Sequence, residues 1–244
     1  MISNKTKIAV SRTKFEKSAY YFVALFVLVF LGFWTTYFSK LFDVNGTIPS
    51  YFHLHAAVML IWVVLLIVQP MLIRKKKTNL HRTIGKVSYV VMPLLLFSVL
   101  LIINNSLKVL PVEKQHFTSI IFPFRDLFLL TTAFSLAIVY RNNIQIHARA
   151  MIITGIIFIE PTLFRFLIHI AFKGNLLLSL VVSIAVVLGI LITLMVMERK
   201  QKTARWMFPV LLFIYIFVYT IYITKTDLSS LDPIARWIAR LPLT

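Results

Sequence analysis

The sequence predicts an all-α polytopic membrane protein, a bundle of seven transmembrane helices followed by a short C-terminal amphipathic helix. Hydrophobic residues make up 59% of the 244 residues and charged residues only 14%, whereas roughly 25% of a soluble domain is charged. Seven apolar segments each approach the ~20 residues that cross a ~30 Å hydrocarbon core. We therefore expect one membrane domain, 19–224, between a basic cytoplasmic tail, 1–18, and an outer interfacial segment, 225–244.

The predicted spans cover residues 19–38, 52–73, 85–103, 117–140, 148–172, 175–197 and 206–224. The first is too long for the apolar core of a signal peptide. It ends in Trp34, Tyr37 and Phe38 instead of small residues, which indicates an uncleaved span. The fifth is the most polar, since it contains Glu160, Pro161, Arg165 and His169.

Basic residues divide unequally between the two sides of this topology. Seventeen of the 26 lysines and arginines fall in the N-terminal tail or near the connections after the second, fourth and sixth spans. Seven fall on the other side, and two lie within spans. Because short loops rich in Lys and Arg stay in the cytoplasm, we predict a cytoplasmic N-terminus and an outside C-terminus. The net charge of +18 is thereby assigned to topology and not to nucleic-acid binding.

The last segment contains the predicted amphipathic helix. Asp232 before Pro233 is a typical helix start. An apolar stripe follows, formed by Ile234, Trp237, Ile238 and Leu241 and opposed by Arg236 and Arg240. This pattern favours a helix lying in the outer membrane interface.

The second span carries a polar stripe. At ~100° per residue, one face of the helix presents His55, Met59, Trp62, Leu66 and Gln69. Polar side chains in hydrocarbon must find partners inside the protein. We therefore expect this face to point into the bundle, with its histidine end toward the outside.

Ionisable residues inside the spans predict one polar pocket in the outer half of the bundle. Each costs ~2.5–3.5 kcal/mol in hydrocarbon unless it is compensated. Arg125 and Glu160 lie at similar depths in the fourth and fifth spans, which predicts an ion pair. The expected pocket walls are His53 or His55, Trp62, Arg125, Asp126, Glu160, Arg165 and His169, with His116 at the rim. A register-fixing salt-bridge network that binds nothing is the alternative.

Two further sets are weaker. His81 and His147 begin the third and fifth spans at the cytoplasmic side, either as interfacial histidines or as a pair facing each other. Tyr215, Tyr219 and Tyr222 share one face of the seventh span, which is more typical of helix packing and an aromatic belt than of a pocket wall.

Three kinds of chemistry fit this pocket. A b-type haem could use His55 and His169 as axial ligands. A zinc ion could use imidazoles from His53, His55 and His169 with a carboxylate of Asp126 or Glu160. An anionic or lipid ligand could use Arg125 and Arg165. The absence of cysteine excludes disulfides, iron–sulfur clusters and covalently attached haem c.

Motifs between residues 50 and 170 resemble an uncharacterised bacterial family of multipass membrane proteins. They read HxHAAxMxxWxxLLxxQPxLI, LHRxxGKxSYxxxP and HARAM with a downstream Glu-Pro and Arg. The resemblance implies a bacterial inner-membrane protein of unestablished reaction. Its family-type positions are His55, Trp62, Gln69, His81, Arg82, Gly85, His147 and Arg149. The layout is more loosely similar to membrane b-type cytochromes.

The expected function is therefore binding of a redox cofactor, foremost haem b, for electron transfer with a redox partner. Its ligands would come from His55, His169, Trp62, Arg125 and Arg165, and from His81 and His147 at the inner side. Non-catalytic binding or transport of a small anionic or lipid ligand is the alternative, without a cofactor. A zinc-dependent membrane hydrolase is the third.

Overall fold

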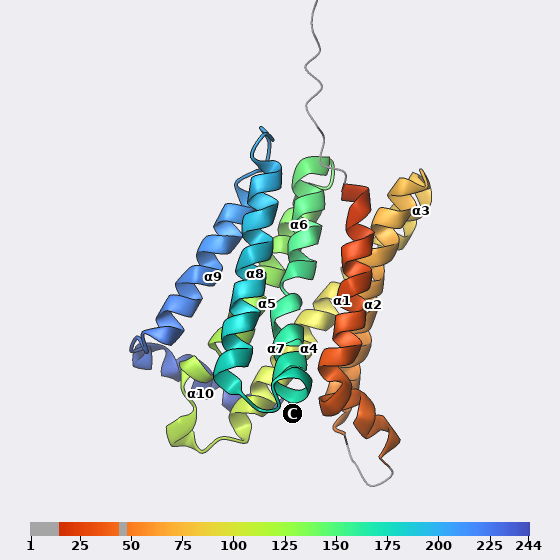
Figure 1. Cartoon of the computed structure of the whole chain (residues 1–244). Helices are drawn as coiled ribbons and strands as arrows, with labels where there is room; N and C mark the ends of the chain where they lie inside the picture. Colours follow the sequence, from red (N-terminus) through yellow and green to blue (C-terminus); the bar gives the residue numbers. More distant parts are fainter. Residues whose placement is uncertain (1–14, 44–47) are drawn as a thin grey trace, which may run out of the picture.

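The computed structural model describes residues 15–43 and 48–244, and every regular element in these ranges is helical (Figure 1). The helices are α1 Ser18–Phe33, α2 Ser50–Arg74, α3 Thr78–Gly85, α4 Ser88–Lys108, α5 Ile121–Val139, α6 Ile144–Ile156, α7 Ile159–Phe166, α8 Leu176–Glu198, α9 Met207–Ile223 and α10 Asp232–Arg240. The predicted all-α class is confirmed for these residues. Residues 1–14 of the basic tail predicted for 1–18 lie outside the described residues.

Six helical stretches are long and apolar enough to cross a membrane, which makes this a multipass membrane protein by length and composition. They are Ser18–Phe42, Ser50–Arg74, Thr78–Lys108, Ile121–Val139, Ile144–Ala171 and Leu176–Glu198. The segment predicted as the seventh span is also a helix, α9, and it is apolar. With 17 residues it is ~26 Å long at 1.5 Å per residue, slightly less than the ~30 Å hydrocarbon core.

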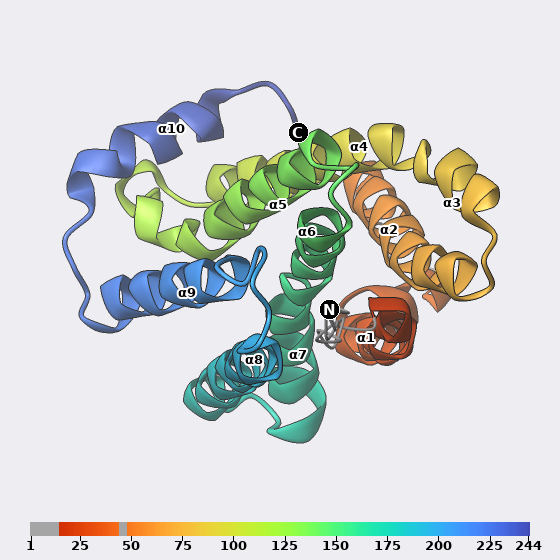
Figure 2. The same cartoon turned by 90° about the horizontal axis from the view of Figure 1, so that it is seen from above.

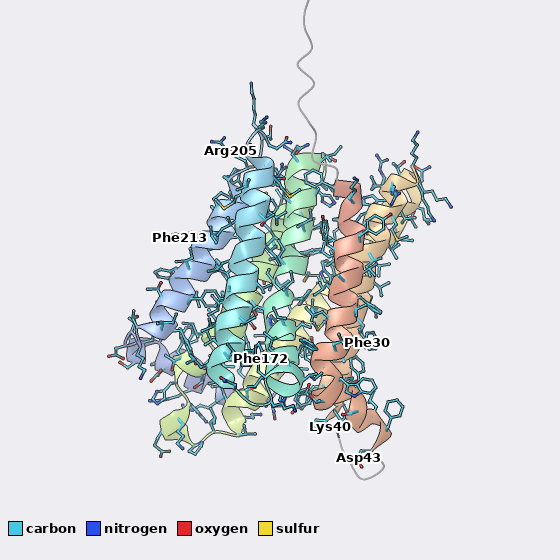
Figure 3. The ribbon with its side chains drawn as sticks, viewed as in Figure 1. Phe30, Lys40, Asp43, Phe172, Arg205 and Phe213 are labelled. Carbon is cyan, nitrogen blue, oxygen red and sulfur yellow. The ribbon has the colours of Figure 1, made fainter. Side chains whose placement is uncertain are left out.

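Successive long helices run in opposite directions, so their connections gather at two ends. Arg205 marks one end, and Lys40, Asp43 and Phe172 mark the other (Figure 3). We call these the Arg205 end and the Lys40 end. Seen from above, α6 and α7 occupy the middle, with α1 and α2 to one side and α5 and α9 to the other (Figure 2). Direct packing joins α1 to α2 and α7, and α5 to α4 and α6.

Two predicted spans are divided in the structure. The span 85–103 begins within α3 and continues as α4 to Lys108. The span 148–172 is α6, a break at residues 157–158, α7 and a π-helical turn, Leu167–Ala171. Pro161 is tolerated in the first turn of α7, where backbone N–H groups lack helical partners in any case. A second π-helical turn, Trp34–Phe38, follows α1.

The predicted stripe of α2 does face the bundle interior. Met59, Trp62 and Leu66 are buried in the main core, and Trp62 has no exposed surface. Trp62 packs edge-on against Phe134 of α5. The prediction that this face points inward is therefore confirmed.

Helix α10 begins at Asp232 as predicted, but its buried face differs from the predicted stripe. Ala235, Ile238 and Ala239 are buried on the side that packs against α4, whereas Ile234 and Trp237 are exposed. Small alanines let α10 approach α4 closely and Ile238 of the stripe packs there, whereas the interfacial placement of the exposed Ile234 and Trp237 stays a prediction.

Side chains hold α10 at both ends. Asp232 accepts hydrogen bonds from His116 Nδ1 at 2.8 Å and from the Phe117 N–H at 2.9 Å, and these bonds lower the pKa of Asp232. Asn104, fully buried in α4, donates to the carbonyl of Ile238 at 2.6 Å. His116 therefore serves α10, and its predicted place at the pocket rim is wrong.

Close packing of α1 against α7 positions the helices around the interior at the Lys40 end. A Cβ added at Gly32 would lie 2.4 Å from the carbonyl oxygen of Thr162, a backbone atom that cannot move aside without separating the helices. Glycine is thus required here by helix approach, as is common in membrane bundles.

Gly32→Ala is expected to lower the stability of the purified protein by ~1–3 kcal/mol, the usual effect of overpacking. Gly189→Ala in α8 is the matched control, since an added Cβ there meets nothing within 4 Å. Thermal unfolding in detergent measures both variants. An unchanged midpoint for Gly32→Ala would contradict the proposed helix contact.

Candidate functional site

A buried ion cluster joins α5, α7 and α9. Arg125 donates from Nε and Nη2 to Asp126 Oδ1, at 2.9 and 2.7 Å, and from Nη2 to Glu160 Oε2 at 2.7 Å. Tyr219 donates its hydroxyl to the same Glu160 oxygen at 2.6 Å. The ion pair predicted between Arg125 and Glu160 is confirmed.

Aromatic rings complete the surroundings of Arg125. Its guanidinium lies 4.3 Å from the ring centre of Tyr215, 5.4 Å from that of Phe122 and 5.5 Å from that of Tyr219. Such cation–π contacts are strongest where water is excluded. Two members of the predicted tyrosine stripe thus belong to the ion cluster. Their depth in α9, level with Arg125, was a signal that could have assigned them.

A cavity of about 490 Å³ lies beside the cluster, toward the Lys40 end. Its walls come from α1, α2, α4, α5, the α6–α7 break and α7, and most of them are apolar. The lining residues include Val29, Phe33, Phe52, Met59, Leu60, Val99, Ile102, Leu130, Ile157 and Phe158. The polar side chains on its wall include His55, Asp126, Arg165, Thr36, Tyr37 and Lys40. This volume is within the range of small-molecule sites.

Arg165 is a half-buried cation on this wall, and it has no salt bridge to a carboxylate of the described residues. Its Nη1 donates to the carbonyl of Pro161 at 2.9 Å, and its guanidinium lies 4.9 Å from the ring centre of Phe33. In the part of the chain that the structure describes, no carboxylate oxygen lies within 4.0 Å of it. The guanidinium therefore retains donors for an anion.

The hydrogen bonds of His55 fix which ring nitrogen carries its proton. Ser98 donates its single hydroxyl hydrogen to the carbonyl of Leu95 at 2.7 Å. The contact of 3.0 Å between Ser98 Oγ and His55 Nδ1 must then be donated by the imidazole. A neutral His55 consequently has a lone pair on Nε2, which can accept a hydrogen bond or bind a metal.

The other predicted wall residues lie elsewhere. His169 is exposed on the π-helical turn after α7, and His53 is exposed and contacts the Tyr37 hydroxyl at 2.8 Å. Trp62 is in the core and is not among the cavity-lining residues. Arg125 and Glu160 lie behind Asp126. The cavity thus combines His55, Asp126 and Arg165 of the predicted set.

His81 and His147 have separate partners. His147 Nδ1 lies 2.8 Å from the carbonyl of Ala137, to which it can only donate. The side-chain amide of Gln69 has one orientation in which both its nitrogen and its oxygen have partners. In that orientation it donates to His81 Nδ1 and accepts from the Gly85 N–H at 3.0 Å. Nearby, fully buried Arg149 donates to Glu198 at 2.7 Å. These bonds give a packing role to residues in all three sequence motifs.

The proposed cofactor ligands are only partly assembled. Within residues 15–43 and 48–244, no three histidine, aspartate or glutamate side chains are grouped as around a metal ion. His55 and His169, the predicted axial pair for haem, do not share the cavity. His55 is the imidazole on the cavity wall.

Comparisons of the chain with protein-family models, curated proteins and solved structures found no match. The resemblance over residues 50–170 therefore remains a prediction.

Tyr219→Phe is expected to lower stability by ~1–2 kcal/mol, because a buried hydrogen bond to a carboxylate is lost. Tyr222→Phe is the control, since Tyr222 is 40% exposed and packs on Phe122 through its ring. Thermal unfolding of the two variants should separate by several degrees. Equal midpoints would mean that Tyr219 does not stabilise the cluster.

Proposed function

We propose that the protein binds a small amphipathic ligand in the cavity at the Lys40 end, with an acidic group of the ligand on Arg165. Its place would be a bacterial cytoplasmic membrane, with seven spans, the N-terminus in the cytoplasm and the cavity in the outer half. The role is non-catalytic binding or transport of a lipid-like molecule.

The observation that carries this proposal is that no carboxylate of the described residues lies within 4.0 Å of the Arg165 guanidinium. A cation at membrane depth is unfavourable unless an anion or water compensates it. The planar guanidinium suits a carboxylate or phosphate, which it can bind through two parallel hydrogen bonds. The apolar lining from α1, α2 and α4 suits a hydrocarbon portion of the same molecule.

Haem b, for electron transfer, is the second candidate, and the lone pair on His55 Nε2 favours it. A haem is itself an apolar disc with two carboxylates, which Arg165 and Lys40 could bind. Its second axial ligand would have to come from a residue other than His169, or the iron would have one protein ligand.

Arg165→Gln is expected to reduce the amount of co-purifying acidic amphiphile at least about tenfold, because a charge-assisted pair contributes ~1.5–3 kcal/mol. Native mass spectrometry of detergent-purified protein measures the bound mass. Arg240→Gln is the control, since Arg240 is exposed on α10. Equal occupancy in both variants would refute the assignment of Arg165. A reducible Soret band lost in His55→Ala would instead favour haem.

The topology can be tested with single cysteines, because the natural chain contains none. Lys114→Cys, at the Lys40 end, should react with a membrane-impermeant maleimide in intact spheroplasts. Lys202→Cys, near the Arg205 end, should react only after lysis. Labelling of both from the same side would contradict the three crossings predicted between residues 114 and 202, and labelling of Lys202→Cys alone in intact spheroplasts would reverse the orientation.

A further inference from the structure

Asp126 places a second, opposite charge on the wall of the cavity. Its Oδ1 accepts both hydrogen bonds from Arg125, while its Oδ2 accepts none from the residues that the structure describes. The side chain keeps 16% of its surface exposed, and it lines the cavity with Arg165. A molecule bound to Arg165 therefore meets a carboxylate as well as a guanidinium.

Charge balance limits the ligands that this arrangement suits. Buried Arg125 and half-buried Arg165 are matched in formal charge by the carboxylates of Asp126 and Glu160. A ligand that carries an anion alone would pair with Arg165 but leave the Asp126 carboxylate beside it without a cation from the ligand. A ligand with both an anion and a cation would not. Lys40 is exposed and lies where water can screen it.

His55 adds a requirement for hydrogen-bond donors. Its Nδ1 donates to Ser98, so its Nε2 accepts. The free oxygen of Asp126 also accepts. A primary ammonium carries three N–H donors and can serve both acceptors, whereas a quaternary ammonium carries none.

Resting on the proposed function, we infer that the ligand is zwitterionic, a lipid whose phosphate binds Arg165 and whose primary ammonium binds Asp126 and His55. This is the chemistry of a phosphoethanolamine headgroup. The apolar walls favour a lipid over the free headgroup. A ligand without an acyl chain would leave these walls in contact with water.

The test compares ligands on the full-length protein in an uncharged maltoside detergent. The probes are lysophosphatidylethanolamine, lysophosphatidylcholine and lysophosphatidylglycerol with one acyl chain, and phosphoethanolamine without a chain. Thermal-shift titration gives the affinities. We expect lysophosphatidylethanolamine to bind at least about tenfold more tightly than the other three. Because the comparison uses the natural protein, it does not depend on a variant that folds.

The outcomes separate this inference from the proposed function. Equal binding of the three lysolipids would overturn the zwitterion and leave acidic-lipid binding standing. Phosphoethanolamine binding as tightly as its lipid would overturn the lipid source. Failure of every probe and of an acidic amphiphile, laurate, would overturn the proposed function itself. In a folded Asp126→Asn variant, preference for ethanolamine over glycerol headgroups should fall, whereas Asp43→Asn, outside the cavity, should retain it.

Discussion

The buried guanidinium of Arg125 is the constraint on which the rest of this bundle depends. A cation in the apolar interior must be compensated by the protein, and three helices contribute to doing so. Asp126 comes from α5 itself, Glu160 from α7 and the Tyr219 hydroxyl from α9. Each of these hydrogen bonds is short and directional. All of the bonds can form together only when the three helices have one particular depth relative to one another. The cluster thus fixes both register and rotation.

The cavity follows from the same constraint. Glu160 can reach Arg125 because the chain breaks after α6 and starts a new helix, α7, one residue before it. The break at residues 157–158 and the following Pro161 then form part of the cavity wall. A continuous helix through this region would turn Glu160 and Arg165 in other directions. The helix break at residues 157–158, which lets Glu160 reach Arg125, therefore also forms part of the cavity that Arg165 lines.

Depth along a helix and the inward face of α2 could be predicted from the sequence, whereas the rotation of α9 and of the turn after α7 could not. The pairing of Arg125 with Glu160 rests on a fixed rise per residue, and it was found. His169 was expected on the same pocket wall as Arg165, four residues before it, but the π-helical turn Leu167–Ala171 changes the angle per residue and His169 is exposed. Tyr219 was assigned to packing for a related reason, since nothing local in the sequence shows which way α9 turns its aromatic face.

Two arginines show how structural and ligand-binding charges can be distinguished in such a bundle. Arg149, near the Arg205 end, is fully buried and donates from Nε to Glu198 and from Nη1 to the side chain and the carbonyl of Gln145. Arg165 has one carbonyl, one ring and an adjoining cavity. If both cations served only to fix helix register, both would need carboxylates at hydrogen-bond distance. Among the described residues only Arg149 has a carboxylate at hydrogen-bond distance, so Arg165 keeps N–H donors for solvent or a ligand, and the apolar walls beside it favour the ligand.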